Sequence, residues 1–138
     1  MSTALVTGAS DGIGLEFCRI LADRGYDLIL VARRKDKLNE IGKSLSAEKD
    51  IKCTVISADL SKPHAAQKLF QATQKKSLQV DLLINNAGLL HNGLFTELDL
   101  VAQENMITVN ILALTSLTHL FANDMASRGG GRILNVAS

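Results

Sequence analysis

Residues 4–14 read ALVTGASDGIG, a short apolar run followed by closely spaced glycines. The run Ala4–Thr7 has the length of a buried strand, and apolar residues recur at helical spacing from Ile13 to Leu21. At such a junction, glycines allow a tight turn, bring the backbone close to a phosphate and let the helix pack against the strand. The stretch therefore predicts a phosphate-binding loop, with an ordinary strand-to-helix turn as the alternative.

Four more strand-like runs follow, and helical patterns separate them. The runs cover residues 28–31, 53–56, 80–84 and 132–136. Continuous apolar strands that alternate with helices form a parallel sheet covered on both faces. We therefore predict an α/β fold with a doubly wound parallel sheet of the Rossmann type, in which five strands are present. We expect residues 1–138 to be a single dinucleotide-binding domain, incomplete at its C-terminus because the fifth strand would be a bare apolar edge.

Three further helices are expected between these strands. The first carries Leu38, Ile41 and Leu45, and the second starts at Pro63 behind Ser61. The third runs from about residue 98 to 127, with a break expected near Asn105. Its apolar tract, residues 106–122, is interrupted by polar side chains, which indicates a buried helix and not a membrane span.

The residues after the second strand bear on the choice of cofactor. In an NAD-binding unit an acidic residue about 20 positions after the glycine loop binds the ribose 2′-hydroxyl. Here residues 32–35 read ARRK, and the first acid is Asp36. Arg33 and Arg34 can pair with a 2′-phosphate, although a solvated helix start is the alternative for Arg34 and Lys35. NADP(H) is therefore favoured over NAD(H).

The composition excludes several other classes of function. A net charge of +1 gives no excess of basic residues that would indicate binding to nucleic acid or to an anionic membrane. Two cysteines, Cys18 and Cys53, suit a reducing compartment, and we expect both to be small buried hydrophobes. No signal peptide is visible, so we expect a cytoplasmic protein. The three histidines have no metal-ligand spacing, and no metal site is expected.

Several motifs together resemble the short-chain dehydrogenase/reductase family from Ala4 to Ser138. The resemblance rests on the glycine loop, on Asp59-Leu60 after the third strand, on Asn85-Asn86-Ala87-Gly88 closing the fourth, on Asn110 in the long helix, and on Ser138. Together with Arg33 and Arg34, which the absence of an acid indicates, it gives the following cofactor-binding residues: Gly8, Ser10, Asp11, Gly12, Ile13, Gly14, Arg33, Arg34, Asp59, Leu60, Asn86, Ala87 and Gly88.

The resemblance also implies a chemistry. Ser138 would be the catalytic serine that holds the substrate, a small-molecule carbonyl or alcohol, and the helix at Asn110 would hold a water of the proton relay. Asp59 would bind the adenine amino group, its alternative being a helix cap. Asn85 is expected to tie neighbouring strands together. The buried amide of Asn110 could instead be a core polar residue that is satisfied by backbone or water. A homo-oligomer is also expected.

The family's hydride transfer needs a Tyr-x-x-x-Lys pair beyond the serine strand. The only tyrosine, Tyr26, lies between the first helix and the second strand, without a lysine four residues later. We therefore expect the chain to be a fragment of an NADP(H)-dependent oxidoreductase that is inactive alone. A non-catalytic nicotinamide-nucleotide-binding or interaction module is the alternative.

Overall fold

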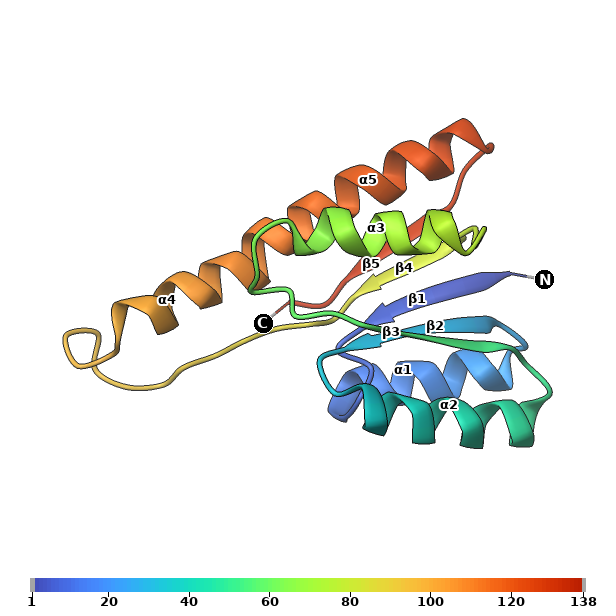
Figure 1. Cartoon of the computed structure of the whole chain (residues 1–138), viewed down its shortest axis with the longest axis horizontal. Coiled ribbons are helices and arrows are strands. Elements are labelled where there is room, and N and C mark those ends of the chain that lie inside the picture. The colour runs from blue at the N-terminus through green and yellow to red at the C-terminus, as the bar shows by residue number, and fades with distance from the viewer. Residues whose placement is uncertain (1, 138) are drawn as a thin grey trace.

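A five-stranded parallel sheet forms the centre of the molecule, with helices on both of its faces (Figure 1). The computed structural model describes residues 2–137. The strand order is β3-β2-β1-β4-β5, and the strands are β1 (Thr3–Thr7), β2 (Asp27–Ala32), β3 (Cys53–Ser57), β4 (Leu82–Asn85) and β5 (Arg132–Asn135). The predicted α/β fold with a doubly wound parallel sheet is confirmed.

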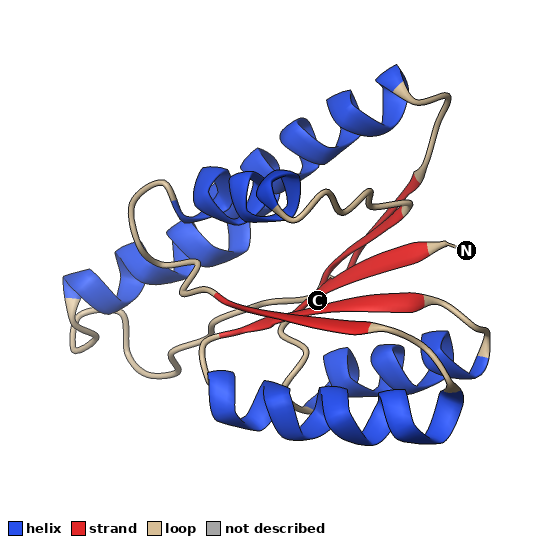
Figure 2. Cartoon of the chain, turned by 45° about the vertical axis from the view of Figure 1, so that its right-hand side comes forward, coloured by secondary structure: helices blue, strands red, loops and turns tan. Residues whose placement is uncertain are grey.

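Two helical layers cover the two faces of this sheet (Figure 2). One layer consists of α1 (Gly12–Asp23) and α2 (Lys35–Lys49). The other consists of α3 (Ala65–Lys75) and a long continuous helix, made of α4 (Leu100–Ile107), a π-helical segment η1 (Thr108–Ala113) and α5 (Leu114–Ser127).

Successive strand residues supply the two halves of the core. Leu5 and Ile29 pack with Leu117 and Phe121 of α5, whereas their strand neighbours pack against α1 and α2. This alternation follows from the strand geometry, because adjacent side chains point to opposite faces of a sheet. The Phe121 ring meets that of Phe70 edge to face, with 5.0 Å between the ring centroids. Both halves of the core are therefore built from the predicted strands.

The two cysteines differ in their environments. Cys18 is buried in the core, and this burial raises the pKa of its thiol to about 12. Cys53 is only half-buried, because it opens the edge strand β3. The prediction of a buried thiol is confirmed for Cys18 and is wrong for Cys53.

Two predicted element starts are wrong. The third helix begins at Ala65, two residues after Pro63, because His64 takes a left-handed conformation with φ of +59°. The fourth strand begins at Leu82 and not at Val80, whose carbonyl oxygen accepts a hydrogen bond from Arg128 Nη2 at 2.7 Å.

The long helix is also different from the prediction. It is not broken at Asn105, and its irregularity lies three residues later, in the π-helical segment η1. Only one face is buried, where Ala113, Leu117, Phe121 and Met125 meet the core, while Ile111 on the outer side is 59% exposed. The whole helix, Leu100–Ser127, is long and apolar enough to cross a membrane by length and composition alone. The core helix of a globular domain can meet the same criterion.

Candidate functional site

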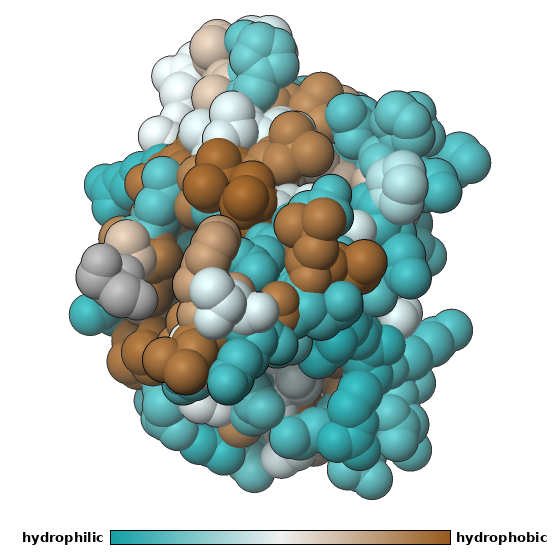
Figure 3. Space-filling model, turned by 90° about the vertical axis from the view of Figure 1, so that its left-hand side faces the viewer, coloured by the Kyte–Doolittle hydropathy of each residue, from teal (hydrophilic) through white to brown (hydrophobic). Residues whose placement is uncertain are grey.

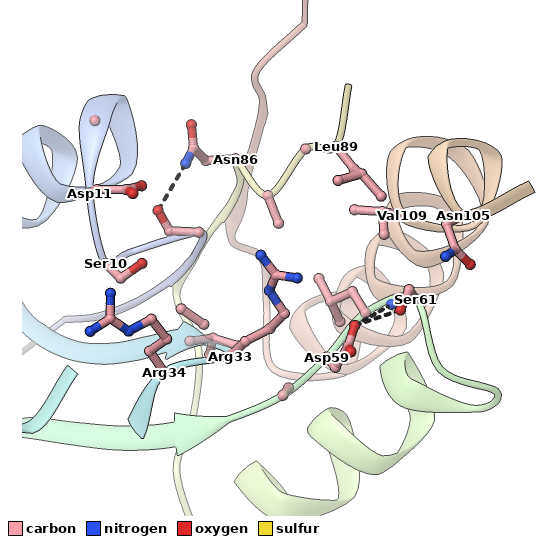
Figure 4. A pocket seen from close by; sticks show the side chains of 18 of the residues that line it. Ser10, Asp11, Arg33, Arg34, Asp59, Ser61, Asn86, Leu89, Asn105 and Val109 are labelled. Atoms are coloured by element: carbon pink, nitrogen blue, oxygen red, sulfur yellow. Dashed lines mark hydrogen bonds between the residues drawn. The ribbon is translucent and has the colours of Figure 1, made fainter. Parts of the chain in front are cut away.

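A hollow of about 610 Å³ lies at the carboxyl ends of β1, β2, β3 and β4 (Figure 4). In open α/β sheets, ligands bind outside the carboxyl ends of the strands, at the point where the order of the strands reverses. The hollow brings together the predicted residues Gly8, Ser10, Asp11, Gly12, Ile13, Arg33, Arg34, Asp59, Leu60, Asn86, Ala87 and Gly88. These residues come from segments far apart in the sequence.

The glycine loop forms one wall and is shaped for close approach of backbone. Gly8 has φ of +65°, a backbone conformation that residues with a Cβ rarely adopt. A Cβ on Gly14 would overlap the carbonyl oxygen of Gly8, so this position tolerates only glycine. Asp11 precedes α1, and within residues 2–137 its side chain does not cap the helix. The first N–H groups of α1 therefore remain available to an anion.

Asn86 supports this loop from the neighbouring strand. Its Nδ2 donates to the carbonyl oxygens of Thr7 and Gly8, each at 3.2 Å. The Thr7 hydroxyl oxygen in turn accepts from the backbone N–H groups of Asn86 and Ala87, at 3.0 and 2.9 Å. The amide side chain of Asn86 thus fixes the glycine loop, while the backbone of Ala87 and Gly88 faces the hollow.

Two arginines reach into the hollow from the end of β2. In Figure 4 the guanidinium of Arg34 points toward Ser10 of the glycine loop, and that of Arg33 extends into the centre of the hollow. The Ser57 hydroxyl donates to the carbonyl oxygen of Arg33 at 2.9 Å and so fixes its backbone. Arg34 has only a long contact of 4.0 Å with Asp36, with both side chains exposed. Both guanidinium groups therefore remain available to an anionic ligand.

Asp59 lies opposite Arg33 and is held in one orientation by Ser61. Its Oδ1 accepts from the backbone N–H of Ser61 at 3.0 Å and from the Ser61 hydroxyl at 2.7 Å. These hydrogen bonds are the main reason that the pKa of the Asp59 carboxyl is lowered, with smaller effects from Lys62 and Arg33. Asp59 therefore shapes the turn at Ser61. It does not cap α3, which begins after His64.

Asn110 is exposed, so the prediction that its amide is buried is wrong. Its side chain pairs with the backbone of Leu89 in both directions, with Leu89 N–H donating to Oδ1 and Nδ2 donating to Leu89 O, both at 2.8 Å. It lies in η1, and such π-helical segments occur frequently at functional sites. The pair fixes the loop after β4 to the long helix. Ser138, the predicted catalytic serine, lies outside the described residues.

Asn85 ties elements together as predicted. Its Nδ2 donates to Asn135 Oδ1 on β5 at 2.9 Å and lies 3.1 Å from Thr118 Oγ1 on α5. It is buried, and therefore it holds β4, β5 and α5 together beneath the hollow.

Nine further residues line the hollow that were not predicted as site residues, namely Val31, Ala32, Lys37, Ala58, Ser61, Leu89, His91, Asn105 and Val109. Lys37 lies in the first turn of α2, shortly after Arg33 and Arg34, and this position could have signalled it. Asn105 and Val109 come from a helix more than 15 positions after the Asn-Asn-Ala-Gly motif, and nothing local marks them. No group of three or more metal-binding side chains occurs in the part of the chain that the structure describes.

The strand order and the position of the hollow define a Rossmann-type α/β domain. The family model for short chain dehydrogenase matches residues 2–138, and the chain belongs to that family.

Curated relatives agree with this assignment. An uncharacterized oxidoreductase of Staphylococcus saprophyticus is 33% identical over 98% of this chain and 58% of its own length. The very-long-chain 3-oxoacyl-CoA reductase-B of Danio rerio is 34% identical over 98% of this chain and 44% of its own. The chain thus spans about half the length of the curated relatives that it matches.

Solved structures give the same result. A short-chain dehydrogenase from Sphingobium yanoikuyae in complex with NADPH has a TM-score of 0.93 and 35% identity, covering all of this chain and 54% of that one. L-sorbose reductase from Gluconobacter frateurii, complexed with NADPH and L-sorbose, has a TM-score of 0.92 and 28% identity, covering 99% of this chain and 52% of that one.

Proposed function

We propose that residues 1–138 form the cofactor-binding domain of an NADP(H)-dependent oxidoreductase that interconverts a small carbonyl compound and its alcohol. When bound, the nicotinamide supplies or accepts the hydride. The observation that carries the choice of NADP(H) is the pair Arg33 and Arg34, which line the hollow at the position where an NAD-binding domain has an acid. The residues present fit this cofactor, because the glycine loop leaves room for a pyrophosphate at the start of α1.

We propose which part of the cofactor each part of the hollow would bind. The pyrophosphate would lie at Gly12, Ile13 and the first turn of α1, and the 2′-phosphate between Arg33, Arg34 and Ser10. An arginine fork suits a phosphate because it donates two parallel, charge-assisted hydrogen bonds. The adenine would then lie near Asp59 and Leu60, and the nicotinamide near Gly88 and Leu89. In support, two neighbours in structure are complexes with NADPH.

The proposal predicts a selective effect of Arg33. Replacing it with alanine (R33A) should weaken NADPH binding about 10- to 100-fold, the value of a charge-assisted hydrogen bond, with little change for NADH. Calorimetric titration of both nucleotides measures this effect. Arg24→Ala, at the opposite end of α1 and outside the hollow, is the matched control. Equal losses for NADPH and NADH in R33A would mean that Arg33 does not bind the 2′-phosphate.

Catalysis by the complete enzyme would use Ser138 to hold the substrate oxygen, and the helix at Asn110 to hold a water. Since Tyr26 lies far from the hollow, between α1 and β2, these 138 residues by themselves should bind the nucleotide without hydride transfer. A non-catalytic nucleotide-binding module is the second candidate. An assay of NADPH oxidation by a ketone distinguishes the two candidate functions, because only the oxidoreductase would show this activity once a Tyr-x-x-x-Lys segment is present.

We further propose that the domain is cytoplasmic and that the long helix packs on the sheet and not in a bilayer, because Leu117 and Phe121 are buried in the core.

The outer face of the long helix would pair with a second copy of the chain, since Ile107, Ile111 and Leu112 are between 57% and 60% exposed. Sedimentation of the chain should then show a dimer or larger species, which I111E converts to monomer. A wild-type monomer would contradict the pairing, and uptake into lipid vesicles would favour a bilayer instead.

A further inference from the structure

Asn105, on α4, lies at the end of the hollow that is next to Ser61. It lines the hollow together with Asp59, Leu60, Ser61 and Val109. In Figure 4 its amide points toward the end of the hollow where Ser61 and Asp59 lie. The phosphate-binding loop and Arg34 lie on the opposite side of the hollow, with Arg33 between them and Asp59. A group bound beside Asn105 would therefore be the base of the adenosine half, if the nucleotide lies as proposed above.

Three polar side chains near Asn105 on the long helix have partners within the chain. Gln103 Nε2 donates to the Leu98 carbonyl oxygen at 3.2 Å, and the Thr108 hydroxyl donates to that of Glu104 at 3.0 Å. Asn110 is paired with Leu89. Across residues 2–137, the side chain of Asn105 makes no hydrogen bond, although it is half-buried. A half-buried amide without an internal partner is available to a ligand at little cost.

Asp59 alone cannot complete the recognition of an adenine edge. Its Oδ1 already accepts two hydrogen bonds from Ser61, which leaves Oδ2, and a carboxylate can only accept. The edge of adenine presents both an amino donor and ring nitrogens that accept. An asparagine amide offers a donor and an acceptor side by side, and it pairs with adenine in this way in nucleic-acid recognition. The apolar side chains of Leu60 and Val109 would contact the ring faces.

We propose that Asn105 binds the adenine edge of the dinucleotide and is a specificity-determining residue for that base. This inference rests on the proposed function, since it takes the hollow to hold a nicotinamide dinucleotide. Asn105 donates to a ring nitrogen of adenine and accepts from its amino group, and Asp59 Oδ2 accepts from the same amino group. Hypoxanthine, which has an oxygen in place of the amino group, loses the hydrogen bonds that this group donates.

The test compares three nucleotides on the same chain: NADPH, its hypoxanthine analogue, and 2′,5′-ADP, which lacks the nicotinamide half. In N105A the affinity for NADPH and for 2′,5′-ADP should fall by the same factor, about three- to tenfold, the size of one hydrogen bond. The affinity for the hypoxanthine analogue should change less. N105L, which keeps the number and branching of the side-chain heavy atoms but has no polar group, should behave as N105A does, and circular dichroism tests whether both variants are folded.

Glu104→Ala is the matched control, because this side chain is exposed on the same turn and does not line the hollow. It should leave all three affinities unchanged. Equal losses for NADPH and the hypoxanthine analogue would overturn the inference in favour of a structural role for Asn105, and so would unchanged affinities in N105A. A loss for NADPH but not for 2′,5′-ADP would place Asn105 at the nicotinamide half and overturn it as well. Wild-type chain that binds none of the three would instead refute the proposed function itself.

Discussion

The side chains of Thr7 and Asn86 connect the ends of β1 and β4 at the floor of the hollow. Asn86 donates to two carbonyl oxygens of the glycine loop, and Thr7 accepts from two backbone N–H groups after β4. The glycine loop thus depends on a residue that is 78 positions away in the sequence. Rigid placement of this loop fixes where a pyrophosphate can bind.

Removal of the Asn86 amide should therefore affect stability and binding together. We expect N86A to lower the free energy of unfolding by about 2 kcal/mol, because two part-buried carbonyl groups lose their donor. Nucleotide affinity should fall in the same variant. Urea denaturation and calorimetric titration measure the two effects. Asn123→Ala, whose side chain is exposed on α5, should change stability by less than about 0.5 kcal/mol. An N86A protein as stable as the wild type would refute this role.

For individual residues, the sequence predicted well which of them line the hollow. It predicted less well which hydrogen bonds each side chain makes. Asn86 was expected to bring its backbone near the cofactor, but its side chain supports the glycine loop. Asp59 was assigned to adenine in preference to a cap, yet one of its oxygens is engaged by Ser61. Hydrogen-bond partners depend on how loops from different strands meet, and local spacing carries no such information.

The long helix shows how one element serves both the core and the site. Its inner face carries Leu117 and Phe121 into the core. Nearer the start of the same helix, the segment η1 presents Asn110 to Leu89. A π-helical segment holds one extra residue in its turns, so it changes which side chains face the sheet. We infer that η1 lets the same helix present buried residues to α3 and Asn110 to the loop after β4.

Truncation of a side chain on the inner face of the long helix should therefore lower the free energy of unfolding more than truncation of one on the outer face. F121A should lower the free energy of unfolding by about 3–5 kcal/mol, because it leaves a cavity opposite Phe70. The outer residue Ile111 is 59% exposed, and I111A should cost less than about 1 kcal/mol in a monomeric chain. Chemical denaturation at low protein concentration compares the two. Similar losses in both variants would contradict the assignment of the two faces.

All five strands could be predicted from apolar runs, and their observed bounds differ from the predicted ones by at most two residues. The helix starts were less predictable. Pro63 suggested a helix start, but the left-handed His64 delays the helix to Ala65. The break expected at Asn105 is instead a change of helical register at Thr108, since a helix packed along one side on a sheet can continue through a polar residue.

On the scale of the whole molecule, one face carries several exposed apolar side chains. Figure 3 shows apolar side chains, in brown, on the face turned toward the carboxyl ends of the strands. The four most exposed ones belong to the loop after β4 and to the start of α4, namely Leu90, Leu94, Phe95 and Leu100. Exposed patches of this kind mark interaction or ligand sites in soluble proteins. The sequence could not foresee this face, because apolar loop residues carry no periodic signal.

The central claim is that the hollow at the strand ends binds a nicotinamide dinucleotide and prefers the 2′-phosphorylated form. Calorimetric titration of NADPH and of NADH into the chain, at the same low ionic strength, tests it most directly, because the two nucleotides differ only in the 2′-phosphate that we propose Arg33 and Arg34 bind. We predict saturable binding of NADPH that is at least about tenfold tighter than that of NADH. Binding of NADH as tight as that of NADPH, or no saturable binding of either nucleotide, would contradict the claim.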